Sequence, residues 1–77
     1  MSSLEKKDLM FIDLEKLKKE LRAKNISQEK LAKELGYNSQ ASISAILNGY
    51  TLMKVVDLSI IVNEFGIDLQ DIMKEDN

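Results

Sequence analysis

The sequence predicts an all-α domain of five short helices, and two observations lead to this fold class. Apolar residues recur three and four positions apart along most of the chain, which places them on one face of a helix. The breaks between these stretches carry helix-capping residues or glycine, in a chain with three Gly and no Pro. A length of 77 residues suits one compact domain with one core.

The first three expected helices cover residues 13–24, 28–35 and 40–47. Asn25 ends the first, whereas Ser27 is a suitable N-cap and Gly36 a suitable C-terminal residue for the second. Asn38 or Ser39 caps the third, and Asn48-Gly49 ends it. Their apolar faces consist of Leu14, Leu17 and Leu21, then Leu31, Ala32 and Leu35, then Ile43, Ile46 and Leu47.

A fourth helix is expected over residues 54–65, although the β-branched run VVDLSIIV could be taken for a strand. The apolar residues of this run keep the three-four spacing and do not alternate, which favours a helix. Its inward residues are then Val55, Leu58, Ile61, Val62 and Phe65. Gly66 ends this helix, and Asp68 caps a fifth that runs through Met73. Residues 1–12 form an N-terminal arm or an extra turn, and residues 74–77 an acidic tail.

Composition narrows the function classes. The chain has no His and no Cys, so it offers no thiolate or imidazole for catalysis or for a metal, and we expect neither an enzyme nor a cofactor. Its longest early apolar run, residues 9–12, is far shorter than the roughly 20 residues of a membrane helix, which indicates a cytoplasmic protein. Residues 1–56 hold ten basic and seven acidic residues, whereas residues 57–77 hold one Lys and six acidic residues. The last quarter should therefore face away from any polyanion.

The stretch ISQEKLAKELGYNSQASISAILNG, residues 26–49, resembles the helix-turn-helix of Cro and the phage repressors, the XRE family. Its most specific parts are S-Q-x-x-L-A-x-x-L-G in the second helix and I-S-x-I-x-N-G in the third. Residues 55–73 resemble that family's fourth and fifth helices, so the resemblance covers about residues 13–73. It implies a compact phage-repressor-like DNA-binding domain with the helix-turn-helix at helices 2 and 3.

The third helix has small, uncharged residues opposite its apolar face. A helix with small side chains can lie deep in a major groove about 12 Å wide, where Gln pairs with adenine and an Ala methyl contacts the thymine methyl. The alternative is an ordinary exposed helix face. The expected base-reading residues are Gln40, Ala41, Ser44 and Ala45.

For the phosphates, the resemblance points to Gln28 at the start of the second helix and to Asn48 after the third. A helix N-terminus also attracts anions through its free amides and its partial positive charge. For Tyr50 a place at the core edge is an equal alternative, and Lys30 and Lys33 are better explained as solvated. The other phosphate candidates are Ser39, Tyr50, Thr51 and Lys54.

Two departures from the family pattern yield structural expectations. Leu21 and Leu47 occupy positions where many relatives carry a paired Arg and Glu, and two apolar residues can replace a buried ion pair without loss of stability. We therefore predict that Leu21 and Leu47 touch. Val56 and Ile60 lie four apart, off the apolar stripe of the fourth helix, and form a candidate dimer interface. The alternative is their burial against residues 1–12.

The leading interpretation is a sequence-specific binder of double-stranded DNA, a transcriptional repressor acting as a homodimer on an inverted repeat. The alternative is a protein-interaction module on the same fold, such as an antitoxin-like or regulatory partner. The negative net charge favours this alternative slightly, because DNA affinity depends on phosphate contacts. Lysines 30, 33 and 54 around the third helix would instead favour DNA.

Overall fold

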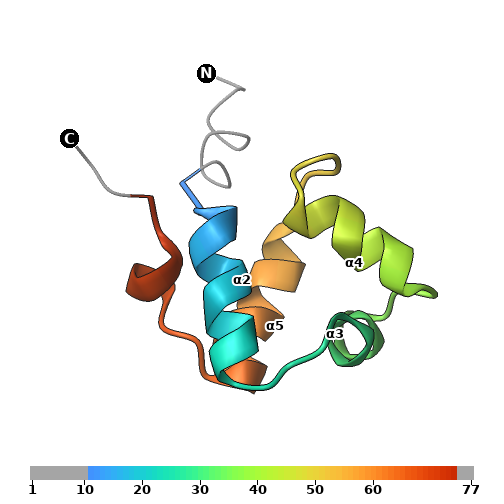
Figure 1. The fold of residues 1–77 in the computed structure, drawn as a ribbon, viewed down its shortest axis with the longest axis horizontal. Coiled ribbons are helices and arrows are strands. Elements are labelled where there is room, and N and C mark those ends of the chain that lie inside the picture. Colours follow the sequence, from blue (N-terminus) through green and yellow to red (C-terminus); the bar gives the residue numbers. More distant parts are fainter. Residues whose placement is uncertain (1–10, 75–77) are drawn as a thin grey trace.

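The computed structural model describes residues 11–74, and this part of the chain is helical. It contains the α-helices α2 (Leu14–Ala23), α3 (Gln28–Leu35), α4 (Gln40–Leu47) and α5 (Val55–Phe65), then the 3-10 helix η1 (Leu69–Ile72). α3 packs against α4, and η1 packs against α2. Figure 1 shows η1 on one side of α2 and the α3–α4 pair on the other. The acidic end of the described chain is thus remote from α4.

The expected helices over residues 28–35 and 40–47 are confirmed by α3 and α4. The fifth expected α-helix is wrong in type, because residues 69–72 form a single 3-10 turn. The chain leaves this turn at Met73, which is extended and forms an antiparallel bridge with Ile12. That pairing ends the helix after four residues, about one turn. The described part therefore has four α-helices and one 3-10 helix.

Most helix starts are capped by a side chain. Asp13 Oδ1 accepts from the backbone N–H groups of Glu15 and Lys16, at 3.0 and 3.2 Å, and Ser27 Oγ accepts from Lys30 N–H at 3.0 Å. α4 and α5 differ, since their N-cap residues Ser39 and Lys54 make no side-chain cap bond. Of the two residues proposed to cap α4, Ser39 occupies the N-cap position, but its hydroxyl accepts no hydrogen bond from the first turn of the helix.

Residues 11 and 12, expected in the N-terminal arm or extra turn, pack against the rest of the domain. Ile12 is buried, Asp13 N–H donates to Ile72 O at 2.8 Å, and Lys74 N–H donates to Phe11 O at 2.6 Å. These bonds fix the start of α2 against the end of η1. The remainder of the expected arm, residues 1–10, and residues 75–77 of the expected tail lie outside the described residues.

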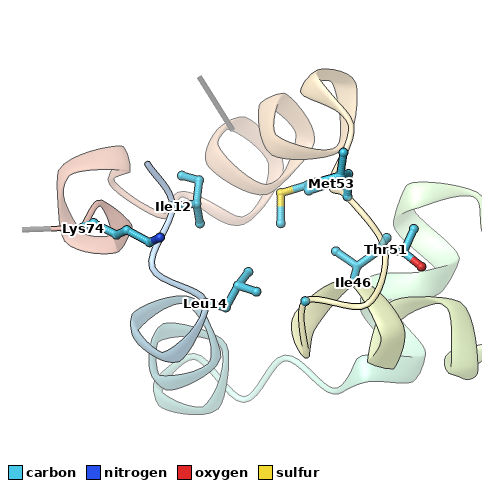
Figure 2. Close-up of a pocket in the computed structure, with 8 residues that line it drawn as sticks. Ile12, Leu14, Ile46, Thr51, Met53 and Lys74 are labelled. Atoms are coloured by element: carbon cyan, nitrogen blue, oxygen red, sulfur yellow. The ribbon is translucent and has the colours of Figure 1, made fainter. Parts of the chain in front are cut away.

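A loop of residues 48–54 joins α4 to α5 and borders a small, largely apolar hollow of about 180 Å³. Figure 2 shows Leu14 and Ile12 on one side of this hollow, and Ile46 and Met53 on the other. Gly49 turns the chain here at φ 83°, and a Cβ on it would lie 3.6 Å from Leu14 Cδ1. The positive φ, more than the space, therefore explains the glycine at this position.

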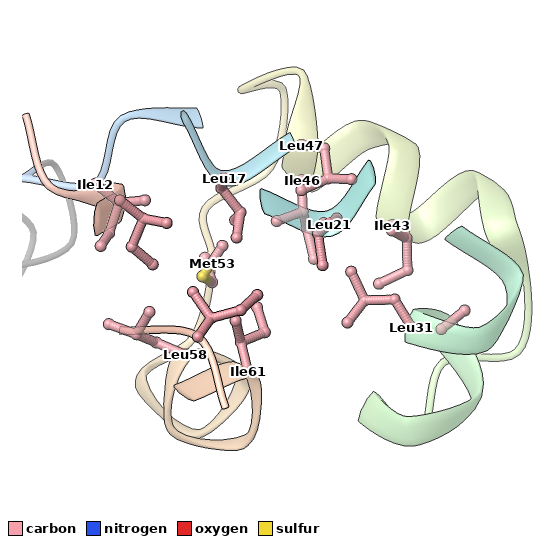
Figure 3. Packing of buried hydrophobic residues seen from close by; sticks show 13 residues of the cluster. Ile12, Leu17, Leu21, Leu31, Ile43, Ile46, Leu47, Met53, Leu58 and Ile61 are labelled. Atoms are coloured by element: carbon pink, nitrogen blue, oxygen red, sulfur yellow. The ribbon is translucent and has the colours of Figure 1, made fainter. Parts of the chain in front are cut away.

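The core is formed by apolar side chains from every described element. Figure 3 shows Leu17 and Leu21 from α2, Leu31 from α3, and Ile43, Ile46 and Leu47 from α4 in one cluster with residues of α5. Leu21 and Leu47 are both buried in this cluster. Their direct contact stays a prediction, although their shared burial is the environment that it requires.

The inward face of α5 differs from the expected one at its start. Val55 was expected inside, but it is 68% exposed, and Asp57 is 3% exposed. Asp57 lies four residues before the buried Ile61 and so shares its face of the helix, whereas Val55 is the first helical residue and lies outside that face. Ile60, expected to be exposed with Val56, is half-buried because it adjoins the same inner face. Val56 is 58% exposed, as expected.

The unequal caps of α3 and α4 give a paired test of stability. Ser27→Ala removes a bond to the first turn of α3 and should lower the free energy of unfolding by about 1 kcal/mol. Ser39→Ala removes no cap bond and should change it by less than about 0.5 kcal/mol. Urea denaturation followed by circular dichroism measures both. An equal loss for the two variants would contradict the difference in capping.

Candidate nucleic-acid interface

α4 is held by its apolar face and presents its N-terminal end to solvent. Ile43, Ile46 and Leu47 are buried, whereas Gln40 and Ala41 are exposed in the first turn. The helix has neither an acidic residue in its first turn nor a basic one in its last. The expected base-reading face is therefore open at Gln40 and Ala41, without any charge on the helix itself.

Ser44 and Ala45, the other two expected base-reading residues, are half-buried. Ser44 Oγ accepts a hydrogen bond from Asn48 Nδ2 at 3.2 Å. The carbonyl of Ala45 accepts from the N–H groups of Tyr50 and Thr51 at 2.8 and 3.3 Å, so the loop folds back over this end of the helix. Because a hydroxyl has one hydrogen and two lone pairs, Ser44 keeps its hydrogen for an acceptor such as a purine N7.

The phosphate candidates lie at two kinds of site, helix starts and the loop after α4. Gln28 is half-buried at the start of α3, whereas Ser39 is exposed at the start of α4. In the loop, Asn48 and Thr51 are exposed and Tyr50 is 85% exposed, which excludes the alternative place for Tyr50 at the core edge. Each of these side chains except Gln28 is thus open to a ligand.

The lysines named at the outset lie around α3 and the start of α4. Lys30 and Lys33 are exposed on α3, and Lys33 lines an open hollow that also includes Gln40. Lys54, the N-cap residue of α5, has its Nζ 5.9 Å from the centroid of the Tyr37 ring. Tyr37 and Gln40 line the same hollow, together with Lys33 and Glu29, so both a positive and a negative side chain border the uncharged start of α4 there.

A buried polar pair ties the turn between α3 and α4 to α5, and sequence reasoning missed it. The Tyr37 hydroxyl donates to Asp57 Oδ2 at 2.6 Å. This hydrogen bond, burial and the negative charge of Asp57 together raise the pKa of Tyr37 from 10.0 to about 12. Asp57 was counted only among the acidic residues of the last quarter, but its position four residues before Ile61 was a signal of burial. An acid on an apolar face needs such a donor.

A second polar link was also missed. Lys18 Nζ, on α2, lies 3.3 Å from Asn48 Oδ1 at the end of α4, and 3.0 Å from Glu15 Oε2. No local pattern predicts this link, since residues 18 and 48 become neighbours only through the packing of α2 against α4. A cation therefore adjoins the last turn of α4.

Other classes of site find little support in residues 11–74. This part of the chain holds no group of three His, Cys, Asp or Glu side chains placed to bind a metal. None of its helices is long and apolar enough to cross a membrane.

α4 is a short helix whose exposed side bears amide and small side chains and whose other side is buried in the core. A second helix, α3, and a tight turn precede it. This arrangement defines a helix-turn-helix DNA-binding protein. The family model described as helix-turn-helix matches residues 17–72. The chain belongs to this family, the DNA-binding regulators with an XRE-type helix-turn-helix. No match was found among curated proteins or among solved structures.

The raised pKa of Tyr37 predicts a distinct alkaline sensitivity. A tyrosine whose pKa is higher in the folded state stabilises the fold fully below pH 10.0, and this contribution is lost as pH rises through about 12. Tyr37→Phe should be less stable near neutral pH by about 1–3 kcal/mol, because Asp57 loses its donor. It should also lose less stability than the wild type between pH 10 and 12.

Urea denaturation across this pH range measures both effects, and Tyr50→Phe is the matched control because Tyr50 is exposed. If Tyr37→Phe and wild type declined in parallel above pH 10.0, the Tyr37–Asp57 bond would not be the source of the sensitivity.

Proposed function

We propose that this protein regulates transcription by binding a specific sequence of double-stranded DNA, as a repressor that forms a homodimer on an inverted repeat. The observation that carries the proposal is the placement of Gln40 and Ala41 on the exposed first turn of α4, with Ile43, Ile46 and Leu47 anchoring its other face. A dimer that covers an operator represses by excluding other proteins from the same DNA.

Base reading in this proposal depends on small side chains entering the major groove. Gln40 pairs with adenine through N6 and N7, and Ala41 contacts a thymine methyl. Ser44 serves as a hydrogen-bond donor, since Asn48 already donates to its oxygen. Ala45 is half-buried beneath the loop, so its small side chain lets α4 approach the groove closely more than it contacts a base.

Phosphate contacts supply the affinity that these residues lack. Ser39 adds a hydroxyl beside the uncapped N–H groups at the start of α4, and Gln28 adds a side-chain amide at the start of α3. Asn48, Tyr50 and Thr51 continue the contacts along the loop. Lys54, which lies beside the Tyr37 ring, adds a positive charge.

The dimer in this proposal uses exposed apolar side chains near the start of α5. Val56, one of the two candidate interface residues, is exposed, as is its neighbour Val55. Ile60, the other candidate, is half-buried. A cluster of such residues on a small domain is typical of an interaction surface. Two copies joined here would present their α4 helices to half-sites about one DNA turn, roughly 34–36 Å, apart. The exposed apolar residues are Tyr50, Leu52, Val55 and Val56.

The same apolar surface supports a second candidate function, a module that binds another protein. In that case the surface of Leu52, Val55 and Val56 contacts a different chain instead of a second copy. The lysines beside α4 favour DNA between the two candidates, because a chain with a net charge of −2 must concentrate positive charge where DNA binds.

Selection from randomised duplex DNA, followed by titration of the enriched duplex at several salt concentrations, tests the function. Gln40→Ala should weaken binding to that duplex by about 1–3 kcal/mol and relax its preference at one position in each half-site. Binding to a scrambled duplex should stay unchanged. Gln70→Ala, which alters an exposed glutamine on η1, is the control. Selection without an enriched sequence would contradict sequence-specific binding and favour the protein-interaction module.

Sedimentation at several protein concentrations tests the dimer. Val56→Lys places a charge in the apolar surface, so it should shift the protein towards monomer and weaken binding to an inverted repeat more than to a half-site. Asn63→Lys adds the same charge at another exposed position of α5 and should leave the dimer intact. A monomer at all concentrations, both free and on DNA, would contradict the homodimer.

A further inference from the structure

Three side chains form a polar chain that joins α2 to the end of α4. Lys18 Nζ donates to Asn48 Oδ1 at 3.3 Å, and Asn48 Nδ2 donates to Ser44 Oγ at 3.2 Å. The orientation of the Asn48 amide follows from its partners, because an ammonium can only donate and must face the amide oxygen. An amide nitrogen carries two hydrogens, so Asn48 keeps one for a further acceptor.

Glu15 is the other partner of Lys18. Its Oε2 lies 3.0 Å from Lys18 Nζ, one turn earlier on α2. The Lys18 side chain is 23% exposed and that of Glu15 is 81% exposed, so this ion pair lies at the surface. Surface ion pairs contribute little net free energy, and a stronger anion can displace the carboxylate at small cost.

We propose that Lys18 binds a DNA phosphate next to Asn48, and that Glu15 lowers affinity by competing with the phosphate for Lys18. This inference rests on the proposed DNA binding. A phosphate accepting from Asn48 Nδ2 would lie close to Lys18, since Asn48 Oδ1 is already within hydrogen-bond distance of the ammonium. The ammonium has three donors, and Asn48 and Glu15 occupy two of them.

Charge supports this assignment. α4 carries no charged side chain, so Lys18 supplies a positive charge at the end of the helix that enters the groove. At the opposite, N-terminal end of α4, Lys33 and Glu29 line the same hollow as Gln40, and Lys54 lies beside the ring of Tyr37, which also lines it. With Lys18 included, cations border both ends of a neutral recognition helix, as expected of a helix whose two ends approach phosphates on either side of the groove.

A purely structural role for Lys18 would look different. If Lys18 only oriented Asn48, its loss would weaken binding without changing the number of counterions released. If Lys18 binds a phosphate, its loss must reduce the salt dependence, because each neutralised phosphate contributes about 0.9 to the slope of log affinity against log salt. The slope therefore separates a contact from a positioning residue.

The experiment titrates the full chain on the enriched duplex and on a scrambled duplex over a range of salt. Lys18→Met should lower affinity for both duplexes by roughly fivefold to tenfold at low salt, and the slope by about 0.9 for each subunit bound. Lys18→Arg should restore affinity and slope. Glu15→Gln should raise affinity by about twofold to fivefold and steepen the slope. Lys19→Met and Glu64→Gln, at exposed positions, are the matched controls.

The outcomes separate this inference from the proposed function. If Lys18→Met bound DNA with the affinity and the salt slope of the wild type, the phosphate contact alone would be overturned. Glu15→Gln with wild-type affinity would overturn the competition. If the wild type bound neither duplex at low salt, both this inference and the proposed function would be overturned. Circular dichroism of each variant confirms that a loss of affinity does not come from unfolding.

Discussion

The burial of one face of α4 is the constraint on which the proposed interface depends. This helix has eight residues, no side-chain cap at its start and no charged side chain, so its own sequence does little to hold it as a helix. Its position is fixed by Ile43, Ile46 and Leu47, which enter the same core as Leu17 and Leu21 of α2. Because Gln40 and Ala41 lie outside this buried face and are exposed, they are available for recognition.

Polar contacts at the periphery then limit how far α4 can shift on this core. The Tyr37–Asp57 bond holds the turn before the helix, and the Lys18–Asn48 bond holds the residue after it. The two bonds connect α4 to α5 and to α2 respectively, so both ends of the helix are tied to different parts of the domain. In the core itself, Leu21 and Leu47 are buried apolar side chains, so the polar contacts of α4 lie at these two edges and not in the interior.

The sequence predicted those features that depend on local patterns. Ser27, Gly36 and the three-four spacing of apolar residues were sufficient for the bounds of α3 and α4, because capping and periodicity act within one helix. The spacing of Asp57 from Ile61 indicates its inward position, but the sequence could not predict its hydrogen-bond partner, because Tyr37 lies 20 residues away. The 3-10 form of residues 69–72 was missed for a similar reason, because it follows from the pairing of Met73 with Ile12.

The candidate site shows the same division between local and long-range effects. The open positions of Gln40 and Ala41 follow from helix periodicity, whereas Ser44 and Ala45 are half-buried because the loop after α4 folds back onto its last turn. The packing of α2 against α4 brings Lys18 beside Asn48, so a positive charge on α2 adjoins a helix that carries none. In a chain with a net charge of −2, affinity for a polyanion has to come from such local groupings. The packing of helices, more than the composition of the recognition helix, thus determines where positive charge meets DNA in the proposed complex.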